Sequence, residues 1–239
     1  MIATIAQVIN SISSQPRLNP TAIYNEGWMT RLLVYRSIEQ KLVINGIDFG
    51  NLKNWTSEGL ISSPFVFART KREGYTHADM ALGDFSIKYE ERGEITVEKD
   101  ARFFGIIEAK MGSNLSQGTT TVPFVYNQAS RNVACIATQT HDKNCTIFFG
   151  VVAPADMLLK HDIDAQLKLI EQQILDRFAL YDNLNEPKVA DREAIMSKVR
   201  TCNIWSFSYE DWIDCFTDLT VKKELNDFYT ECRKWNRLP

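Results

Sequence analysis

Residues 103–110 read FFGIIEAK, an apolar stretch that ends in a carboxylate and an amine two positions apart. An apolar run such as 103–107 is typical of a central strand that is covered on both faces. Side chains two positions apart lie on the same face of a strand, so Glu108 and Lys110 are expected to point the same way. Because a buried, unpaired charge is costly, these groups need a partner, such as a metal ion or each other.

A second carboxylate belongs to the preceding strand-like segment. Asp79 follows residues 76–78 (THA) and opens the apolar triplet 80–82 (MAL). Asp84 is a rival, but it would lie on the opposite face of a regular strand, so Asp79 is preferred. Two neighbouring carboxylates repel each other, and a hard divalent cation relieves that repulsion while taking further oxygens from backbone and water. The pattern therefore predicts a Mg²⁺ site, with Mn²⁺ as a substitute.

The pattern E-x-K carries weight only through its context, because it occurs three times in the chain. The copy at 39–41 falls on an expected helix, where residues two apart do not share a face. The copy at 186–188 lies in a polar stretch with a proline in its centre. Only the copy at 108–110 lies in an expected core strand that follows an acidic strand. The alternative for this copy is a structural ion pair at a strand end.

The order of elements predicts one α/β domain over residues 1–239, in which a mixed sheet is flanked by helices. We expect a helix from Pro20, with Asn19 as N-cap, to about Gly46, and an irregular connection over 47–63. Strands are expected over 64–69, 75–89, 95–97, 102–111, 146–153 and 203–207, and helices over 123–138, 163–181 and most of 209–235. The core motif region spans about 20–153, and a helical C-terminal part spans about 160–239.

With this order of helix, Asp strand, E-x-K strand and polar helix, roughly residues 20–153 resemble the PD-(D/E)xK nuclease superfamily. The resemblance implies a restriction-endonuclease-like fold and Mg²⁺-dependent hydrolysis of phosphodiester bonds. It implies that the side chains of Asp79 and Glu108 and the backbone carbonyl of Ala109 hold the metal ion. It also implies that Lys110 assists the attacking water.

The same resemblance gives catalytic roles to Glu26 on the early helix and Gln128 on the later one. The sequence departs from the family pattern at Ala78, where the family's name has proline, a position that varies widely. Arg131 shares a helix face with Gln128 and could hold a phosphate, although exposed polar residues would explain both equally well. His77 is a candidate substrate contact, and its alternative is a structural histidine.

Composition limits the partners and the compartment. The 239 residues are 44% apolar and 24% charged, with a formal net charge of −3 at pH 7, so any nucleic-acid surface must be local. The N-terminal stretch lacks the charged and apolar regions of a secretory signal, and no apolar run is long enough to cross a bilayer. The five cysteines include no CxxC pair, which favours reduced thiols and a cytoplasmic protein.

Together these patterns predict a nuclease of nucleic acid, DNA in the first place, of a restriction or genome-defence type. A homodimer would bring two sites to two strands. The alternative function is a catalytically silent relative that keeps the fold and binds nucleic acid or protein. An RNase, or a nuclease of branched or damaged DNA, would share the same site.

Overall fold

The computed structural model describes residues 19–91, 93–119, 122–182 and 191–238. A five-stranded mixed sheet lies at its centre, in the order β13-β12-β9-β6-β3. Its strands are β3 (Asn54–Thr56), β6 (Met80–Gly83), β9 (Phe103–Ala109), β12 (Thr146–Ala153) and β13 (Asn203–Ser208). β9, β12 and β13 run parallel, whereas β6 is antiparallel to β9, and β3 to β6. The predicted mixed α/β architecture is confirmed, with β9 in the middle of the sheet.

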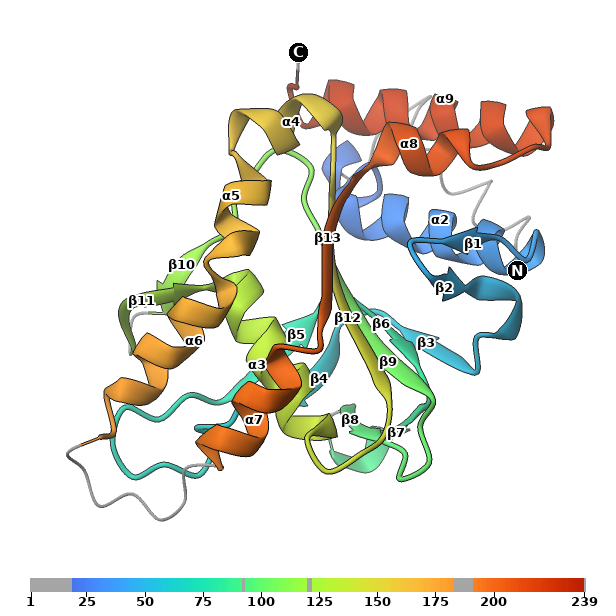
Figure 1. Cartoon of the computed structure of the whole chain (residues 1–239). Coiled ribbons are helices and arrows are strands. Elements are labelled where there is room, and N and C mark those ends of the chain that lie inside the picture. The colour runs from blue at the N-terminus through green and yellow to red at the C-terminus, as the bar shows by residue number, and fades with distance from the viewer. Residues whose placement is uncertain (1–18, 92, 120–121, 183–190, 239) are drawn as a thin grey trace.

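Helices cover both faces of this sheet (Figure 1). One face carries α3 (Gln128–Thr140), α5 (Ile163–Lys168), α6 (Ile170–Ala179) and α7 (Arg192–Val199). The other carries α2 (Glu26–Glu39), α8 (Tyr209–Asp214) and α9 (Leu219–Trp235). Along β9 the buried side chains alternate between the two cores, with Ile106 on the α3 side and Ile107 on the α2 side. By the same alternation, the next residues of the strand lie in turn on the α3 side and on the α2 side.

A second sheet has the order β5-β4-β8-β7 and lies beside the first. Its strands are β4 (Gly59–Ser62), β5 (Tyr75–Ala78), β7 (Phe85–Lys88) and β8 (Glu94–Val97). The chain leaves this sheet after β5, adds β6 to the central sheet and returns with β7. Asp79 lies at the first crossing and Asp84 at the second. The smaller elements are η1 (Pro20–Ala22), β1 (Val43–Ile44), β2 (Ile47–Asp48), η2 (Phe49–Asn51), η3 (Tyr89–Glu91), β10 (Gln117–Thr119), β11 (Val122–Asn127) and α4 (Ala155–Lys160).

The first predicted helix is too long, and the connection after it is not irregular. Pro20 begins only a short 3-10 turn, and α2 starts at Glu26 and ends at Glu39. Lys41 adopts a positive φ of 52°, which a continuing helix does not allow. Asn45 and Gly46, both with positive φ, then form the turn of the β1-β2 hairpin. The stretch expected to be irregular instead contains β2, β3 and β4.

Two further boundaries differ because of local side-chain caps. Residues 64–67 form turns rather than a strand, and Ser63 Oγ accepts the Phe65 N–H at 3.2 Å while donating to the Glu73 carbonyl at 2.9 Å. The helix expected from Pro123 begins at Gln128, because Asn127 caps it by accepting the Ser130 N–H at 3.0 Å. The helices α4 and α7 were not expected. The N-terminal stretch to residue 18 and the E-x-K copy at 186–188 lie outside the described residues.

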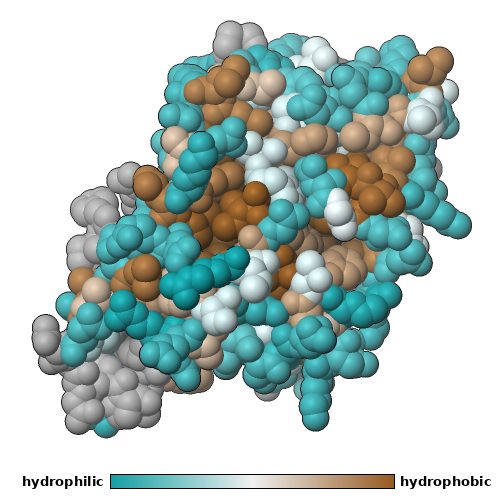
Figure 2. Space-filling view, in the orientation of Figure 1, coloured by the Kyte–Doolittle hydropathy of each residue, from teal (hydrophilic) through white to brown (hydrophobic). Residues whose placement is uncertain are grey.

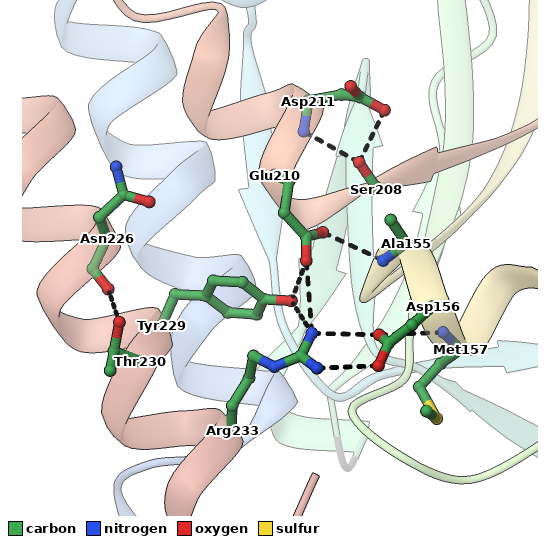
Figure 3. A network of polar contacts seen from close by, with 10 residues as sticks. All are labelled: Ala155, Asp156, Met157, Ser208, Glu210, Asp211, Asn226, Tyr229, Thr230 and Arg233. Atoms are coloured by element: carbon green, nitrogen blue, oxygen red, sulfur yellow. Dashed lines mark hydrogen bonds and ion pairs between the residues drawn. The ribbon is translucent and has the colours of Figure 1, made fainter. Parts of the chain in front are cut away.

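The C-terminal helix is fastened to the carboxyl ends of β12 and β13 by a polar network (Figure 3). Arg233 of α9 donates from both terminal nitrogens to Asp156 of α4, at 3.0 and 2.8 Å. Its Nη1 also reaches Glu210 of α8 at 3.4 Å, and the Tyr229 hydroxyl donates to the same carboxylate at 2.6 Å. The network therefore holds α9 over the strand ends, and with it the helical layer against which α2 packs.

The edge strand β13 is only partly covered. Its residues 204–207 are half-buried. Figure 2 shows apolar side chains gathered in the middle of the face on which β13 lies in Figure 1. Among the described residues, none of the helices combines the length and the apolar character that a bilayer span requires.

Candidate active site

The end of β9 presents Glu108 and Lys110 to the helical face that carries α3. Glu108 is fully buried, and the Lys110 ammonium donates to its Oε1 at 2.7 Å. The side chain of Lys110 is 12% exposed, so this pair lies at the border between core and surface. The two side chains share one face, as the strand period predicts, and they point away from the α2 side of the sheet.

Helix α3 supplies a partner for each of these groups. The Lys110 ammonium also donates to Gln128 Oε1 at 2.9 Å, and Asn132 Nδ2 donates to Glu108 Oε2 at 2.8 Å. The two helical residues are four apart, which places them on one side of the helix, one turn after the other. Asn132 is fully buried, and its Oδ1 finds no hydrogen-bond partner among the described residues. The strand end and the helix thus form one polar cluster.

Asp79 brings a second carboxylate to this cluster. Its Oδ2 accepts the Ala109 N–H at 2.9 Å, so the carboxylate lies against the backbone of β9 beside Glu108. The pKa of Glu108 is raised to about 8, first by burial and then by the negative charge of Asp79, whereas Lys110 opposes the shift. The site therefore sets two carboxyl groups and a single ammonium together, with Glu108 fully buried and Asp79 half-buried.

Asp84, the rival of Asp79, is held elsewhere. Gly83 has a φ of 136°, and a Cβ there would come within 2.4 Å of the Phe103 carbonyl oxygen, so only glycine fits this turn. The turn carries Asp84 to the opposite end of β9, where Arg102 donates to it from its backbone N–H at 2.8 Å and from its guanidinium at 3.0 and 3.1 Å. Asp84 is thus paired at the far end of the strand from Glu108.

Glu26 faces Asp79 across a cleft rather than joining the cluster. The cleft has a volume of about 390 Å³ and is lined by Ala22, Asn25, Glu26, Gly27, Trp28, Arg31, Glu58 and Asp79. Among the described residues, no three His, Cys, Asp or Glu side chains lie close enough together to hold one metal ion. Asp79 is the residue that connects the cleft with the β9 cluster.

Two predicted substrate contacts lie outside the cluster. Arg131 Nε lies 2.5 Å from the buried Glu73 Oε1, and Arg131 Nη2 donates to the Tyr75 carbonyl at 3.0 Å. Arg131 is three residues after Gln128, and this spacing turns it about 60° away from that residue, toward the loop before β5. The side chain of His77 is 65% exposed, and its Nδ1 lies 4.0 Å from Glu58 at the rim of the cleft. The structure therefore brings neither residue to Lys110.

The donor chemistry of the cluster fits a hard divalent cation. Asp79 and Glu108 offer carboxylate oxygens, each oxygen can accept more than one bond, and the unpartnered Asn132 Oδ1 is one more buried oxygen. The carbonyl of Ala109 is the expected backbone ligand. Only two acidic side chains meet here, so further ligands of an ion would have to be backbone and water oxygens. Such a mixed set is common for Mg²⁺, which keeps several waters.

Asn132 is the site residue that the sequence did not reveal. The weak signal was a polar residue four positions after Gln128, within a helix whose neighbouring residues 133–137 are all buried and mostly apolar. A buried amide at that position needs a polar partner, and the strand carrying Glu108 provides it.

Neither a scan against protein-family models nor searches of curated proteins and of solved structures returned a match for this chain.

Proposed function

We propose that the protein is a Mg²⁺-dependent nuclease that hydrolyses phosphodiester bonds, with a PD-(D/E)xK type of site. One observation carries the proposal: Asp79 and Glu108 meet beside Lys110, where burial and mutual repulsion raise the pKa of Glu108. A perturbed carboxylate at the border of a cleft is typical of functional sites. A divalent cation would remove the repulsion that the protein's own residues leave uncompensated.

In this proposal the chain's residues divide the work. Asp79, Glu108 and the carbonyl of Ala109 would hold the ion, which supplies Lewis-acid polarisation of the phosphate and a better nucleophile from water. Lys110 would place its positive charge where negative charge develops on the phosphate. Gln128 fixes the Lys110 ammonium, and Asn132 fixes the Glu108 carboxylate.

The other predicted residues lie outside the cluster of Asp79, Glu108 and Lys110. Glu26 lines the opposite wall of the cleft and would act on the ion or the water only through a bridging molecule. The substrate we infer is DNA, in keeping with a restriction or genome-defence nuclease, and a homodimer would cut two strands. Arg131 would support the substrate side indirectly, by holding the loop before β5.

One observation favours a second candidate, a binding module without catalysis. The Lys110 ammonium already closes on Glu108, and Asp79 and Glu108 have no third acidic partner among the described residues. A silent relative would need no metal ion, and this ion pair would suffice to hold the strand end.

Incubation with nucleic acids separates the two candidates. Supercoiled plasmid, linear duplex, single-stranded DNA and RNA would each be incubated with purified protein in Mg²⁺, Mn²⁺ or EDTA, with Asp79→Asn as the control for contaminating nucleases. The nuclease proposal expects cleavage with Mg²⁺ or Mn²⁺, none in EDTA and none by the variant. Equal cleavage by Asp79→Asn, or no cleavage of any substrate with either ion, would overturn it.

A further inference from the structure

The cleft beside Asp79 carries a flat, positively charged surface on its other wall. Trp28 and Arg31 are three apart on α2, and the guanidinium carbon lies 5.3 Å from the centroid of the indole ring. Both residues line the cleft and are half-buried. A cation over an aromatic ring is a stable arrangement, and indole and guanidinium are both planes on which a nucleobase can stack.

Arg31 differs from the next arginine of the same helix in how it is paired. Arg36 forms close ion pairs with Glu39 at 2.7 Å and with Glu224 at 2.8 Å. Arg31 instead donates to the Ser57 hydroxyl at 2.9 Å, and its contact with Glu58 is 4.0 Å long. Glu58 is itself 58% exposed, so solvent weakens that contact further. The Arg31 guanidinium is therefore the cation of this cleft that can turn to a new anion at little cost.

The charges around the cleft define what can enter. Glu26, Glu58 and Asp79 line it together with Arg31, which is the single cation among the described residues of its wall. An anion would be repelled unless a divalent cation accompanied it, whereas a neutral flat group would meet Trp28. The volume of about 390 Å³ lies at the small end of ligand sites and accommodates a group the size of one nucleotide. A nucleotide combines these features, with a flat base and a phosphate that shares a metal ion with Asp79.

Resting on the proposed function, we propose that Trp28 and Arg31 hold one unpaired nucleotide next to the cleaved phosphate. The substrate would then be single-stranded nucleic acid, or a duplex with an unpaired nucleotide at the cut, which narrows the proposed nuclease to such substrates in place of the intact duplex that a restriction-type homodimer would cut. In an intact duplex the faces of the bases are covered by their neighbours, so a ring at the wall of a cleft has no base face to contact. Trp28 is a substrate-binding residue in this account, and Arg31 contacts the adjoining phosphate.

The first test measures binding rather than cleavage. Fluorescence anisotropy of labelled oligonucleotides in Ca²⁺ would compare single-stranded DNA, single-stranded RNA and a duplex of the same sequence, with the full chain and its variants. We expect the parent to bind the better single strand at least about tenfold more tightly than the duplex. Trp28→Ala should lose roughly tenfold or more, the range found for one stacked base, and Trp28→Phe should lose less.

Control variants come from elsewhere on the chain. Trp55 is 37% exposed on the edge strand β3 and does not line the cleft, so Trp55→Ala should bind like the parent. Arg31→Ala should lower the slope of log affinity against log salt by about one phosphate contact, whereas Arg36→Ala should leave it unchanged. Circular dichroism would confirm that each variant is folded.

The outcomes separate this inference from the nuclease proposal. Duplex binding as tight as single-strand binding, or a folded Trp28→Ala protein together with an Arg31→Ala protein that both bind like the parent, would overturn the inference and leave metal-dependent cleavage untouched. Binding that depends on Trp28 and Arg31 would support it even if no substrate were cleaved, and in that case only the nuclease proposal would fail. Whether single-stranded DNA or single-stranded RNA binds more tightly shows whether the cleft prefers deoxyribose or ribose.

Discussion

Two buried clusters of charged side chains lie against α3, and their charges balance in opposite ways. Glu73 is surrounded by cations, because Arg131 lies 2.5 Å and Arg177 3.6 Å from its carboxylate, and the Tyr126 hydroxyl donates to it as well. At the other cluster, Glu108 meets the carboxylate of Asp79 and only one ammonium, that of Lys110. The first cluster has more cationic than acidic side chains, and the second has more acidic than cationic ones.

This difference shows which of the two clusters could take up a further cation. Arg177 is fully buried, its guanidinium carbon lies 3.9 Å from the centroid of Phe65, and its Nη2 donates to the Lys71 carbonyl at 2.7 Å. Aromatic faces and carbonyls thus take up the extra positive charge, as in a structural cluster. Beside Glu108 no second cation among the residues that the structure describes balances the extra carboxylate, and the raised pKa of Glu108 means that a proton neutralises it until a metal ion takes the proton's place. The network of Figure 3 also sets two carboxylates against one arginine, but there all three groups are partly exposed to water.

The largest effect expected is the loss of stability in Glu73→Gln. This substitution keeps the size of the side chain and leaves the fully buried Arg177 without its carboxylate. Breaking a buried ion pair on one side costs about 3 kcal/mol or more of unfolding free energy. Urea unfolding of parent and variant measures it. A loss below about 1 kcal/mol would mean that the Glu73 cluster is not held together by charge. The contrast drawn between the two clusters would then be wrong.

Lys110→Ala tests the positive charge of the other cluster. The variant keeps Asp79 and Glu108, so it should still bind a divalent ion, while the cleavage rate falls about a hundredfold or more. Rates on a cleaved substrate, together with ion titrations and a thermal melt, separate catalysis from folding. A folded variant that cleaves as fast as the parent would mean that Lys110 is only a structural partner of Glu108.

Asn132→Ala asks whether the orientation of Glu108 matters. The amide holds Glu108 Oε2, and loss of such a supporting contact typically lowers metal affinity by about tenfold or more. The matched control is Thr140→Val, since Thr140 is equally buried on α3 but donates to the Ile136 carbonyl. Calorimetric titration with Mn²⁺ measures both variants. Equal losses in the two would reduce the role of Asn132 to packing.

The smallest effect concerns Asp84, a buried acid whose partner Arg102 reaches the surface. The Arg102 guanidinium holds the pKa of Asp84 below its ordinary value. A depressed pKa stabilises the fold above the unfolded pKa of about 3.9, and this contribution is lost as the pH falls through the folded pKa. Asp84→Asn should thus cost about 1 kcal/mol at pH 7 and less at pH 3 in urea unfolding. A difference that does not shrink with acid would contradict the ion pair.

The sequence predicted the parts of the fold that repeat a simple period. Uninterrupted apolar runs marked β9 and β12, and the two-residue period put Glu108 and Lys110 on one face. The caps by Asn127 and Ser63, which shift a helix start and replace a strand, depend on side-chain geometry that the apolar pattern does not contain.

At the site, the sequence indicated which residues are polar, but not the direction in which each side chain points. Gln128 and Arg131 share a helix face in sequence terms, yet the loop before β5 presents Glu73 to Arg131. That loop is distant in sequence, so only the tertiary structure shows which partner each residue of α3 meets. The contact between Asn132 and Glu108 could not be predicted for the same reason.

The central claim is that the two neighbouring carboxyl groups beside Lys110, those of Asp79 and Glu108, bind a divalent cation. Calorimetric titration of Mg²⁺ and Mn²⁺ into the parent, Asp79→Asn and Asp84→Asn tests it most directly, since the two variants remove one carboxylate each at opposite ends of β9. The amide oxygen that Asp79→Asn introduces could still accept the Ala109 N–H, so the fold should survive. We predict at least tenfold weaker binding in Asp79→Asn and parental affinity in Asp84→Asn. Equal affinity in the parent and Asp79→Asn, or no binding by the parent, would contradict the account.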